Sequence, residues 1–480
     1  MAFRTLTLTL FLQVGLISNS NFAQCAFWDG FELRTDTFTN PAFGNIISPE
    51  ADKTGKPFLY LAAKDAGIKI YDISEAGRPV FIGAVDTSEL EGLDAINLLQ
   101  QGIHLYVTLG DIWSNEEKSG LAILDVSDPE NAFVTDVYSF PDPTRGAGCV
   151  VVREPFAYLA AMRNGLIILN ISDKSDIQFK SQLTFENNFP HTMIGGDGLY
   201  NARGIDLLDN IAYICYDRGA LRVVNIADEE HPVEINKYCF APLINKATAY
   251  NNIFIHDTLA FVALDYYGME ILDISDPLDI QQLGWWHPET WADTTNEYSV
   301  WANSRGHANE LSYDHECQRV YLAAGKSDVV AIDVSNPNDP VTCGLYGSDM
   351  DNYGTWGLDY FNDRVYAAYI WTFIFPPFSH YTGFAELIVN KCISSSDNEN
   401  FQGNAVAVSP NPFFDQFQIE FADGVTRAEI MLMDMYGHIL YEETINHTAS
   451  CTIQLKAVPG IYFLQVRTAN ELKLIKLLNQ

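Results

Sequence analysis

The sequence predicts an all-β protein that consists of a seven-bladed β-propeller followed by a small β-sandwich. Three observations lead to this prediction: an internal repeat, the lack of any long helix-period segment, and a change of pattern near residue 394. The segment LYLAAKDAGIKIYDIS (59–74) recurs as AYLAAMRNGLIILNIS (157–172) and as AFVALDYYGMEILDIS (260–275). The anchors of the repeat are spaced by roughly 45 to 60 residues, which is within the range of propeller blades. These anchors are Asp72, Asp125, Asn170, Asn225, Asp273, Asp333 and Asn390.

Each repeat is predicted to form four short strands. Its centre is an apolar run, a Gly-containing turn and a second apolar run, and such continuous runs are typical of strands buried on both faces. A turn such as SDPENA (127–132) or SDPLDI (275–280) follows, with Asp, Asn and Pro in their usual turn positions. Four-stranded units of this kind bury their faces when they close into a ring.

The two ends of the repeat region are expected to meet. The seventh repeat runs into the segment after Cys392 and therefore lacks a fourth strand of its own. Residues Phe31–Phe38 (FELRTDTF) precede the first repeat and have strand character, so we expect them to supply the missing strand. This pairing would place Cys25 and Cys392 at the same rim, and we predict a disulfide between them.

For the other cysteines the sequence predicts disulfide pairing less firmly. Cys317 and Cys343 lie near one rim of one repeat and are a second candidate pair. Pairing between Cys215 and Cys239 is doubtful because they fall on non-adjacent strands. The two remaining cysteines fall in different domains and are expected to be free: Cys149 and Cys451.

The N-terminus predicts export from the cytoplasm, and the charge balance excludes one class of partner. Arg4 followed by the apolar stretch 6–17 and a small residue at Ala23 predicts a signal peptide over residues 1–23. No later stretch approaches the roughly 18 apolar residues of a membrane span, so we expect no transmembrane segment. Lys and Arg number 28 against 62 Asp and Glu, a net charge of −34. Such a surface repels phosphate backbones, so nucleic acid is not an expected partner.

The repeats resemble the LVIVD family of bacterial and archaeal surface proteins. The residues that carry this resemblance are GLAILDVSDP (120–129) and GMEILDISDP (268–277), with looser copies elsewhere between about residues 45 and 391. The resemblance implies a propeller over residues 25–393 and a surface location. It implies no activity, because the family has no established one.

The C-terminal region is a separate module. Residues 394–404 (SSSDNENFQGN) form a polar linker, and residues 405–480 contain alternating apolar segments that predict a small Ig-like β-sandwich. This module resembles the type A sorting domain of the type IX secretion system of Bacteroidetes. The resemblance implies export through the periplasm and across the outer membrane, with the secretion machinery as a partner and a secreted or cell-surface location. It rests on Pro410, Asn411, Pro412, Asp434, Gly437, Gly460, Tyr462 and the terminal Lys476.

A binding site is expected on one face of the propeller. In a four-stranded antiparallel unit, the second-to-third turn and the connection to the next unit leave the same face. Five long insertions are of this type, and loop elaboration on one face of a rigid scaffold is where function usually lies. They are 111–119, 186–202, 286–305, 348–355 and 371–382.

The charged residues near the start of the inner strands are the candidate ligand-binding residues at the mouth of the channel. An alternative remains open, in which they pair with one another or hold the repeat together. These residues are Asp94, Arg145, Arg203, Asp206, His307, Glu310 and Asp359.

Aromatic residues in two of the insertions are candidates for contact with a sugar or a protein, or for a local core under the loops. They include Trp286, Trp291, Trp301 and Trp371. Asp349, Asp351 and Gly354 only partly match a calcium loop, so we expect no cofactor and leave calcium open. No nucleophile or zinc-protease motif occurs in the sequence.

Two functions are therefore consistent with the sequence. The first is a non-enzymatic surface or extracellular protein that binds a glycan or a protein through the loops of one face. The alternative is an extracellular hydrolase or lyase acting on glycan or peptide, with acid and base drawn from the channel-mouth carboxylates. The fold class cannot choose between them.

Overall fold

The computed structural model divides the chain into two compact units, Met1–Cys392 and Ile393–Gln480, which are described separately below. The predicted signal peptide, the linker 394–404, Cys25 and Cys392 lie outside the described residues. The structure describes residues 28–35, 47–75, 78–111, 118–143, 146–190, 200–244, 249–265, 267–287, 308–325, 329–347, 353–371, 379, 381–389, 406–409, 413–421, 427–434, 439–446, 450–455, 460–468 and 472–479.

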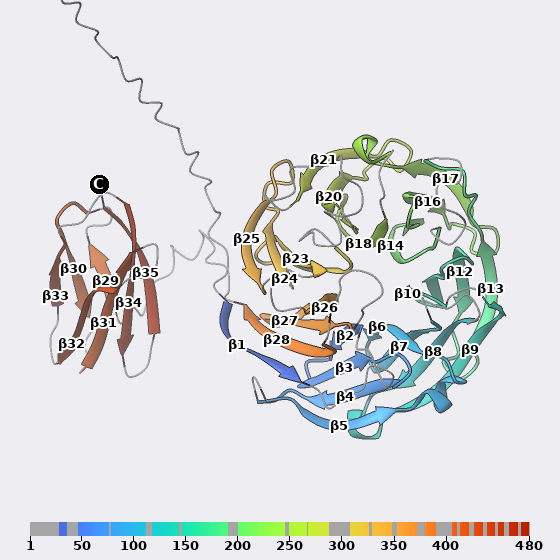
Figure 1. Cartoon of the computed structure of the whole chain (residues 1–480), viewed down its shortest axis with the longest axis horizontal. Coiled ribbons are helices and arrows are strands. Elements are labelled where there is room, and N and C mark those ends of the chain that lie inside the picture. The colour runs from blue at the N-terminus through green and yellow to red at the C-terminus, as the bar shows by residue number, and fades with distance from the viewer. Residues whose placement is uncertain are drawn as a thin grey trace, which may run out of the picture. The chain divides into compact units, whose positions relative to one another are not determined.

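Within its described residues, the first unit contains seven four-stranded antiparallel sheets, which are numbered here by the order of their first strands (Figure 1). Sheet 1 consists of β2 (Ser48–Ala51), β3 (Phe58–Ala62), β4 (Ile68–Asp72) and β5 (Val80–Val85). Sheet 2 consists of β6 (Ala95–Gln101), β7 (His104–Leu109), β8 (Lys118–Asp125) and β9 (Phe133–Pro143). Sheet 3 consists of β10 (Cys149–Arg153), β11 (Phe156–Ala160), β12 (Leu166–Asn170) and β13 (Gln178–Leu183).

The remaining sheets follow the same order along the chain. Sheet 4 consists of β14 (Gly204–Leu208), β15 (Ile211–Cys215), β16 (Leu221–Asn225) and β17 (Val233–Tyr238). Sheet 5 consists of β18 (Tyr250–His256), β19 (Leu259–Leu264), β20 (Gly268–Asp273) and β21 (Gln281–Trp286). Sheet 6 consists of β22 (Leu311–Asp314), β23 (Arg319–Ala323), β24 (Val329–Asp333) and β25 (Val341–Tyr346). Sheet 7 consists of β26 (Thr355–Phe361), β27 (Arg364–Tyr369), β28 (Gly383–Val389) and β1 (Trp28–Thr35).

The first strand of each sheet, called here the inner strand, faces a common axis. Each inner strand contacts the inner strands of the two neighbouring sheets, and β26 contacts β2, so that the cycle of contacts closes (Figure 1). Three short 3-10 helices occur between strands in the described part of this unit: η1 (Thr87–Leu90), η2 (Pro129–Asn131) and η4 (Ala241–Leu243).

The residues of the repeat explain why the sheets recur. An aromatic residue lies in the middle of the second strand of each sheet, and its side chain is almost completely buried between sheets. These residues are Tyr60, Tyr106, Tyr158, Tyr213, Phe261, Tyr321 and Tyr366. In the six sheets whose anchor the structure describes, this Asp or Asn ends the third strand. In six sheets its Oδ1 accepts a hydrogen bond of 2.7–3.0 Å from the backbone N–H two residues later. This turn starts the tight connection to the outer strand.

The N-terminal strand closes the first unit, as predicted. β1 pairs with β28 in antiparallel register, with Leu33 opposite Ala385 and Thr35 opposite Gly383. The observed strand, Trp28–Thr35, begins and ends three residues earlier than the predicted Phe31–Phe38. The first and last parts of the propeller region therefore share sheet 7.

The thiols follow part of the prediction. Cys149 and Cys451 are free, as expected, and Cys215 and Cys239 are free as well. Cys317 and Cys343 are disulfide-bonded. The predicted pair of Cys25 with Cys392 lies outside the described residues.

In the part of the second unit that the structure describes, the strands form a three-stranded and a four-stranded sheet. β29 (Val406–Ser409), β30 (Gln416–Phe421) and β33 (Ser450–Gln454) form the first. β32 (Ile439–Asn446), β31 (Arg427–Asp434), β34 (Gly460–Thr468) and β35 (Leu472–Asn479) form the second. Apolar residues of both sheets share one core, which includes Phe417, Ile419, Leu432 and Leu464. No helix in the described part of the chain is long and apolar enough to cross a bilayer.

Candidate functional site

A small cavity of about 40 Å³ lies where the inner strands begin, and it is called here the axial cavity. Its lining comes from six of the seven sheets and includes Ile96, Gly148, Arg203, Asn251, Glu310 and Trp356. Its size suits a few water molecules or a small polar group.

The connections at this end of the inner strands are the long ones. The segments 184–203, 287–310 and 347–354 join one sheet to the next, and 110–117 and 370–382 join second to third strands. Antiparallel pairing sends all five to the end where the axial cavity lies, called here the loop-bearing face. On the opposite face the first-to-second connections are short, such as 102–103 and 154–155, and the third-to-fourth connections, such as 73–79 and 126–132, have seven residues in each of sheets 1 to 6. The predicted asymmetry between the two faces is confirmed by these connections.

Glu310, a predicted site residue, accepts a hydrogen bond from a residue on the other side of the axis. Its Oε1 accepts a hydrogen bond of 3.0 Å from Asn97 Nδ2, although Glu310 precedes the inner strand of sheet 6 and Asn97 belongs to that of sheet 2. The same Nδ2 donates to Ser48 Oγ at 3.0 Å. Gly357 leaves room for this arrangement, because a Cβ at that position would overlap with the carbonyl oxygen of Ile47 and approach Glu310 Oε2. Burial raises the pKa of Glu310 to about 8, so the carboxyl is protonated at neutral pH.

Arg203, a second predicted site residue, begins a chain of hydrogen bonds along the cavity. Its Nη1 donates to Asn251 Oδ1 at 3.3 Å, and its Nε lies 3.4 Å from Asp217 Oδ2. Asn251 Nδ2 donates in turn to Asn309 Oδ1 at 3.3 Å and to the Ala308 carbonyl at 2.9 Å. Because a guanidinium can only donate, the order of these bonds fixes which end of each amide is oxygen.

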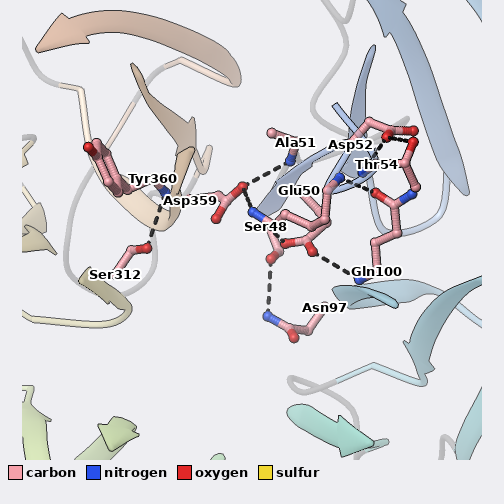
Figure 2. Close-up of polar contacts among 11 residues, drawn as sticks. Ser48, Glu50, Ala51, Asp52, Thr54, Asn97, Gln100, Ser312, Asp359 and Tyr360 are labelled. Carbon is pink, nitrogen blue, oxygen red and sulfur yellow. Dashed lines mark hydrogen bonds and ion pairs between the residues drawn. The ribbon is translucent and has the colours of Figure 1, made fainter. Parts of the chain in front are cut away.

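Asp206 and Asp359 lie further along the inner strands than the predicted channel mouth. Asp359 Oδ2 accepts a hydrogen bond of 2.9 Å from the backbone N–H of Ala51, in the next sheet (Figure 2). Asp206 Oδ2 accepts one of 2.7 Å from the N–H of Ile255, also in the next sheet. Burial raises the pKa of Asp206 to about 6.

The same contact recurs at two further sheet boundaries. Glu50 Oε1 accepts from the N–H of Gln100 at 2.9 Å, and Ser312 Oγ accepts from that of Tyr360 at 3.1 Å (Figure 2). Glu50, Asp206, Ser312 and Asp359 occupy one repeat position, since each pairs with the buried Tyr of its second strand. These four residues are called here the inner-strand latches. The predicted placement of Asp206 and Asp359 at the channel mouth is therefore corrected, because both bond the backbone of the neighbouring sheet.

Asp94 lies before β6 at the loop-bearing face and is held by an ion pair. Lys64 Nζ lies 3.4 Å from Asp94 Oδ2 and 3.5 Å from Asp111 Oδ1. Burial raises the pKa of Asp94 to about 6, against the opposing effect of Lys64. The other two predicted mouth residues, Arg145 and His307, lie outside the described residues.

The aromatic candidates have mixed outcomes. Trp286 is the last residue of β21, is only 5% exposed and donates from Nε1 to Thr342 Oγ1 at 2.8 Å, so it belongs to the core and is unavailable as a loop contact. Trp371 is half-buried at the start of its insertion. Trp291 and Trp301 lie outside the described residues, as do Asp349 and Asp351 of the partial calcium loop. Among the residues that are described, no group of three metal-ligating side chains occurs.

Sequence reasoning missed several residues of this region: Ser48, Glu50, Asn97, Asn251 and Asn309. Each lies on or next to an inner strand, and the signal that could have found them is the alignment of inner strands across the repeats.

Comparison with known families identifies both parts of the chain. Residues 56–87, 144–184 and 320–347 match the LVIVD repeat. Residues 407–479 match the secretion system C-terminal sorting domain. The chain carries LVIVD repeats and a type IX secretion sorting domain. The sorting domain marks the protein for transport to the cell surface or beyond by the type IX secretion machinery.

The sequence motifs of the sorting domain map onto its strands in part. Gly460 begins β34, and Tyr462 on the same strand is buried and pairs with Asp434 at the end of β31. Lys476 lies in β35, the last strand. The motif residues Pro410, Asn411, Pro412 and Gly437 lie outside the described residues.

Several solved structures are similar to this chain at low identity. The computationally designed Ika8 protein is 11% identical, and the match covers 75% of this chain and 100% of that one, with a TM-score of 0.44. PorZ, a surface component of the type IX secretion system of Porphyromonas gingivalis, is 12% identical over 89% of this chain and 64% of that one, with a TM-score of 0.39. The Cps50 (Swd1) β-propeller domain of Myceliophteria thermophila is 9% identical over 75% of this chain and 100% of that one, with a TM-score of 0.48. No protein of curated function matches the sequence.

Proposed function

We propose that this LVIVD-repeat protein is a non-enzymatic binding protein of the cell surface or its surroundings. Residues 25–393 would form a seven-bladed propeller that holds a ligand at its loop-bearing face. Residues 405–480 would form an Ig-like β-sandwich whose task is export. The seven described sheets and the closed cycle of inner-strand contacts support this propeller.

The observation that carries the proposal is the asymmetry between the two faces. All five long connections leave the loop-bearing face, and the axial cavity lies at the same end of the inner strands. A rigid ring with short turns on one face and long loops on the other is the arrangement in which loops position a contact surface. We expect the ligand to be a glycan or a protein.

The environment of the carboxyls favours binding over hydrolysis. A glycosidase needs two carboxyls that are free to exchange protons and to approach the substrate. Asp206 and Asp359 instead accept backbone hydrogen bonds from a neighbouring sheet, Asp94 pairs with Lys64, and Glu310 bonds Asn97. These contacts support a structural role for the carboxyls, which was the alternative left open by the sequence.

A glycan-array comparison tests the proposal. The mature chain, residues 24–480, is compared with a variant in which 112–117 and 372–378 are replaced by Gly-Ser linkers, each with and without calcium. The control variant carries Val233→Ser and Leu278→Ser, which alter residues that are 56% and 64% exposed on the opposite face. We expect binding that the loop variant loses and the control keeps. Binding that is lost only in the control would overturn the proposal. Absence of binding to every glycan would exclude a glycan ligand and leave a protein partner.

A further inference from the structure

The axial cavity contains a hydrogen-bond donor that lacks an acceptor. Asn309 lines the cavity, is 3% exposed, and its Nδ2 has no hydrogen-bond partner among the described residues. Buried polar groups are nearly always paired, so an unpaired one next to a cavity indicates where a ligand group belongs.

The identity of the unpaired atom as a donor follows from its neighbours. Arg203 donates to Asn251, and Asn251 therefore presents its own N–H to Asn309 Oδ1. The end of Asn309 that remains is the NH₂ group. Reversing either amide would set a donor against a donor. Because the Arg203 guanidinium can only donate, this chain of hydrogen bonds places a donor, Asn309 Nδ2, at the wall of the cavity.

The other polar groups of the cavity fit the same kind of ligand. Glu310 is neutral at neutral pH because burial raises its pKa to about 8, so it does not repel an anion. Arg203 brings a positive charge that it shares with Asp217. Ile96 and Met162 supply apolar walls. A planar group with two acceptor oxygens and a short apolar stem matches this lining.

We propose that the axial cavity binds a carboxylate group of the ligand, with Asn309 Nδ2 as a direct donor and Arg203 as the source of positive charge. This assignment rests on the proposed binding function and names the chemistry of the group that enters the ring.

Ligand-observed NMR with two small probes tests the assignment. Acetate carries the carboxylate, and acetamide has the same shape without the charge; both are titrated against the mature chain. We expect acetate to bind more tightly than acetamide. We expect Asn309→Ala and Asn309→Asp each to weaken acetate binding by at least about tenfold, as loss of a charge-assisted hydrogen bond predicts. The matched control is Asn338→Asp, an exposed position on the opposite face of the same sheet, which should leave acetate binding unchanged.

Folding and function are separated by two further readouts. Circular dichroism confirms that a variant is folded, and the variant of Asn309 that folds better is then used. The loop-replacement variant should still bind acetate, because the cavity lining is unchanged. Absence of acetate binding to the mature chain, or equal binding by both Asn309 variants and the parent, would overturn the carboxylate site. Loss of glycan binding in the array with acetate binding intact would instead count against the proposed function alone.

Discussion

Asp359 Oδ2 accepts a hydrogen bond of 2.9 Å from the backbone N–H of Ala51, at the junction where the last sheet meets the first. The two residues are 308 positions apart in the sequence. The same oxygen lies 2.5 Å from Lys53 Nζ (Figure 2 shows Asp359 directed at Ala51). One carboxylate therefore links the two ends of the ring on its inner side, while β1 links them on its outer side.

Removal of this carboxylate should destabilise the propeller. Asp359→Ala leaves the Ala51 N–H and the Lys53 ammonium without their acceptor, and we expect a loss of about 1–3 kcal/mol in the free energy of unfolding. Asp359→Asn keeps an acceptor oxygen and should recover part of this loss. Urea denaturation measures the change, with Asp279→Ala, in an exposed turn, as the control. Equal midpoints for Asp359→Ala and the control would show that the contact contributes nothing.

Arg222 is a fully buried cation on which sheet 4 depends. Its Nη1 lies 2.9 Å from Glu234 Oε1, its Nε donates to the Gly219 carbonyl at 2.8 Å, and its guanidinium lies over the ring of Tyr216. Arg222→Ala removes the donor to that buried carbonyl and one of the two partners of Glu234, which keeps Lys237 at 3.3 Å, so we expect a loss of about 1–3 kcal/mol.

The control for Arg222 is a surface ion pair of the same type. Arg78 and Glu75 lie 3.0 Å apart, but their side chains are 72% and 66% exposed. Arg78→Ala should change the free energy of unfolding by less than about 1 kcal/mol. Chemical denaturation of both variants gives the comparison, and a similar effect at the two sites would refute the structural role assigned to Arg222.

The buried carboxyl of Glu310 should make stability depend on pH. Because burial raises its pKa from 4.5 in the unfolded chain to about 8 in the folded protein, the folded state keeps a proton that the unfolded state releases. Its contribution is fully present below pH 4.5 and is lost as the pH rises through 8. Glu310→Gln, which does not titrate, should therefore lose less stability than the parent between pH 5 and pH 8. Urea midpoints at the two pH values test this, and parallel declines would contradict it.

The sorting domain should be required for export and dispensable for folding of the propeller. Deletion of residues 405–480 removes the region that matches the family. We expect the shortened chain to accumulate in the periplasm, whereas the full chain reaches the surface or the medium. Cell fractionation with an antibody against the propeller measures the distribution. A truncated chain that is exported normally would contradict the role of this domain.

The sequence predicted the repeat and its closure because both depend on local patterns. The Asp or Asn anchors, such as Asp72 and Asp273, bond their own turns, and the apolar runs are buried on both faces wherever they occur. The position of the missing strand followed from counting strands in the repeats. The repeat requires no knowledge of which distant residues meet, and the pairing of β1 with β28 was inferred only because the last repeat lacks a strand.

The axial contacts could not be predicted in the same way. Asn97 and Glu310 are 213 residues apart, and their contact depends on which sheets face each other across the axis. Asp206 and Asp359 were predicted as mouth residues because charge near a strand start suggests a site. Both accept from backbone N–H groups of a neighbouring sheet, which carry no sequence signal, and Asp359 also pairs with Lys53. Trp286 was predicted to belong to an insertion, but it is the last residue of β21, and the connection to the next sheet begins only after it.

A cross-link between β1 and β28 tests the closed ring most directly, since the axial cavity and the loop-bearing face both depend on it. Leu33 and Ala385 lie directly opposite each other, so Leu33→Cys with Ala385→Cys should form a disulfide under mild oxidation, detected by peptide mapping. Ala367 lies beyond Ala385, on the next strand inward, so Leu33→Cys with Ala367→Cys should remain reduced. Cross-linking of the first pair alone is the result we predict. A first pair that stays reduced in the folded protein would contradict the closed ring.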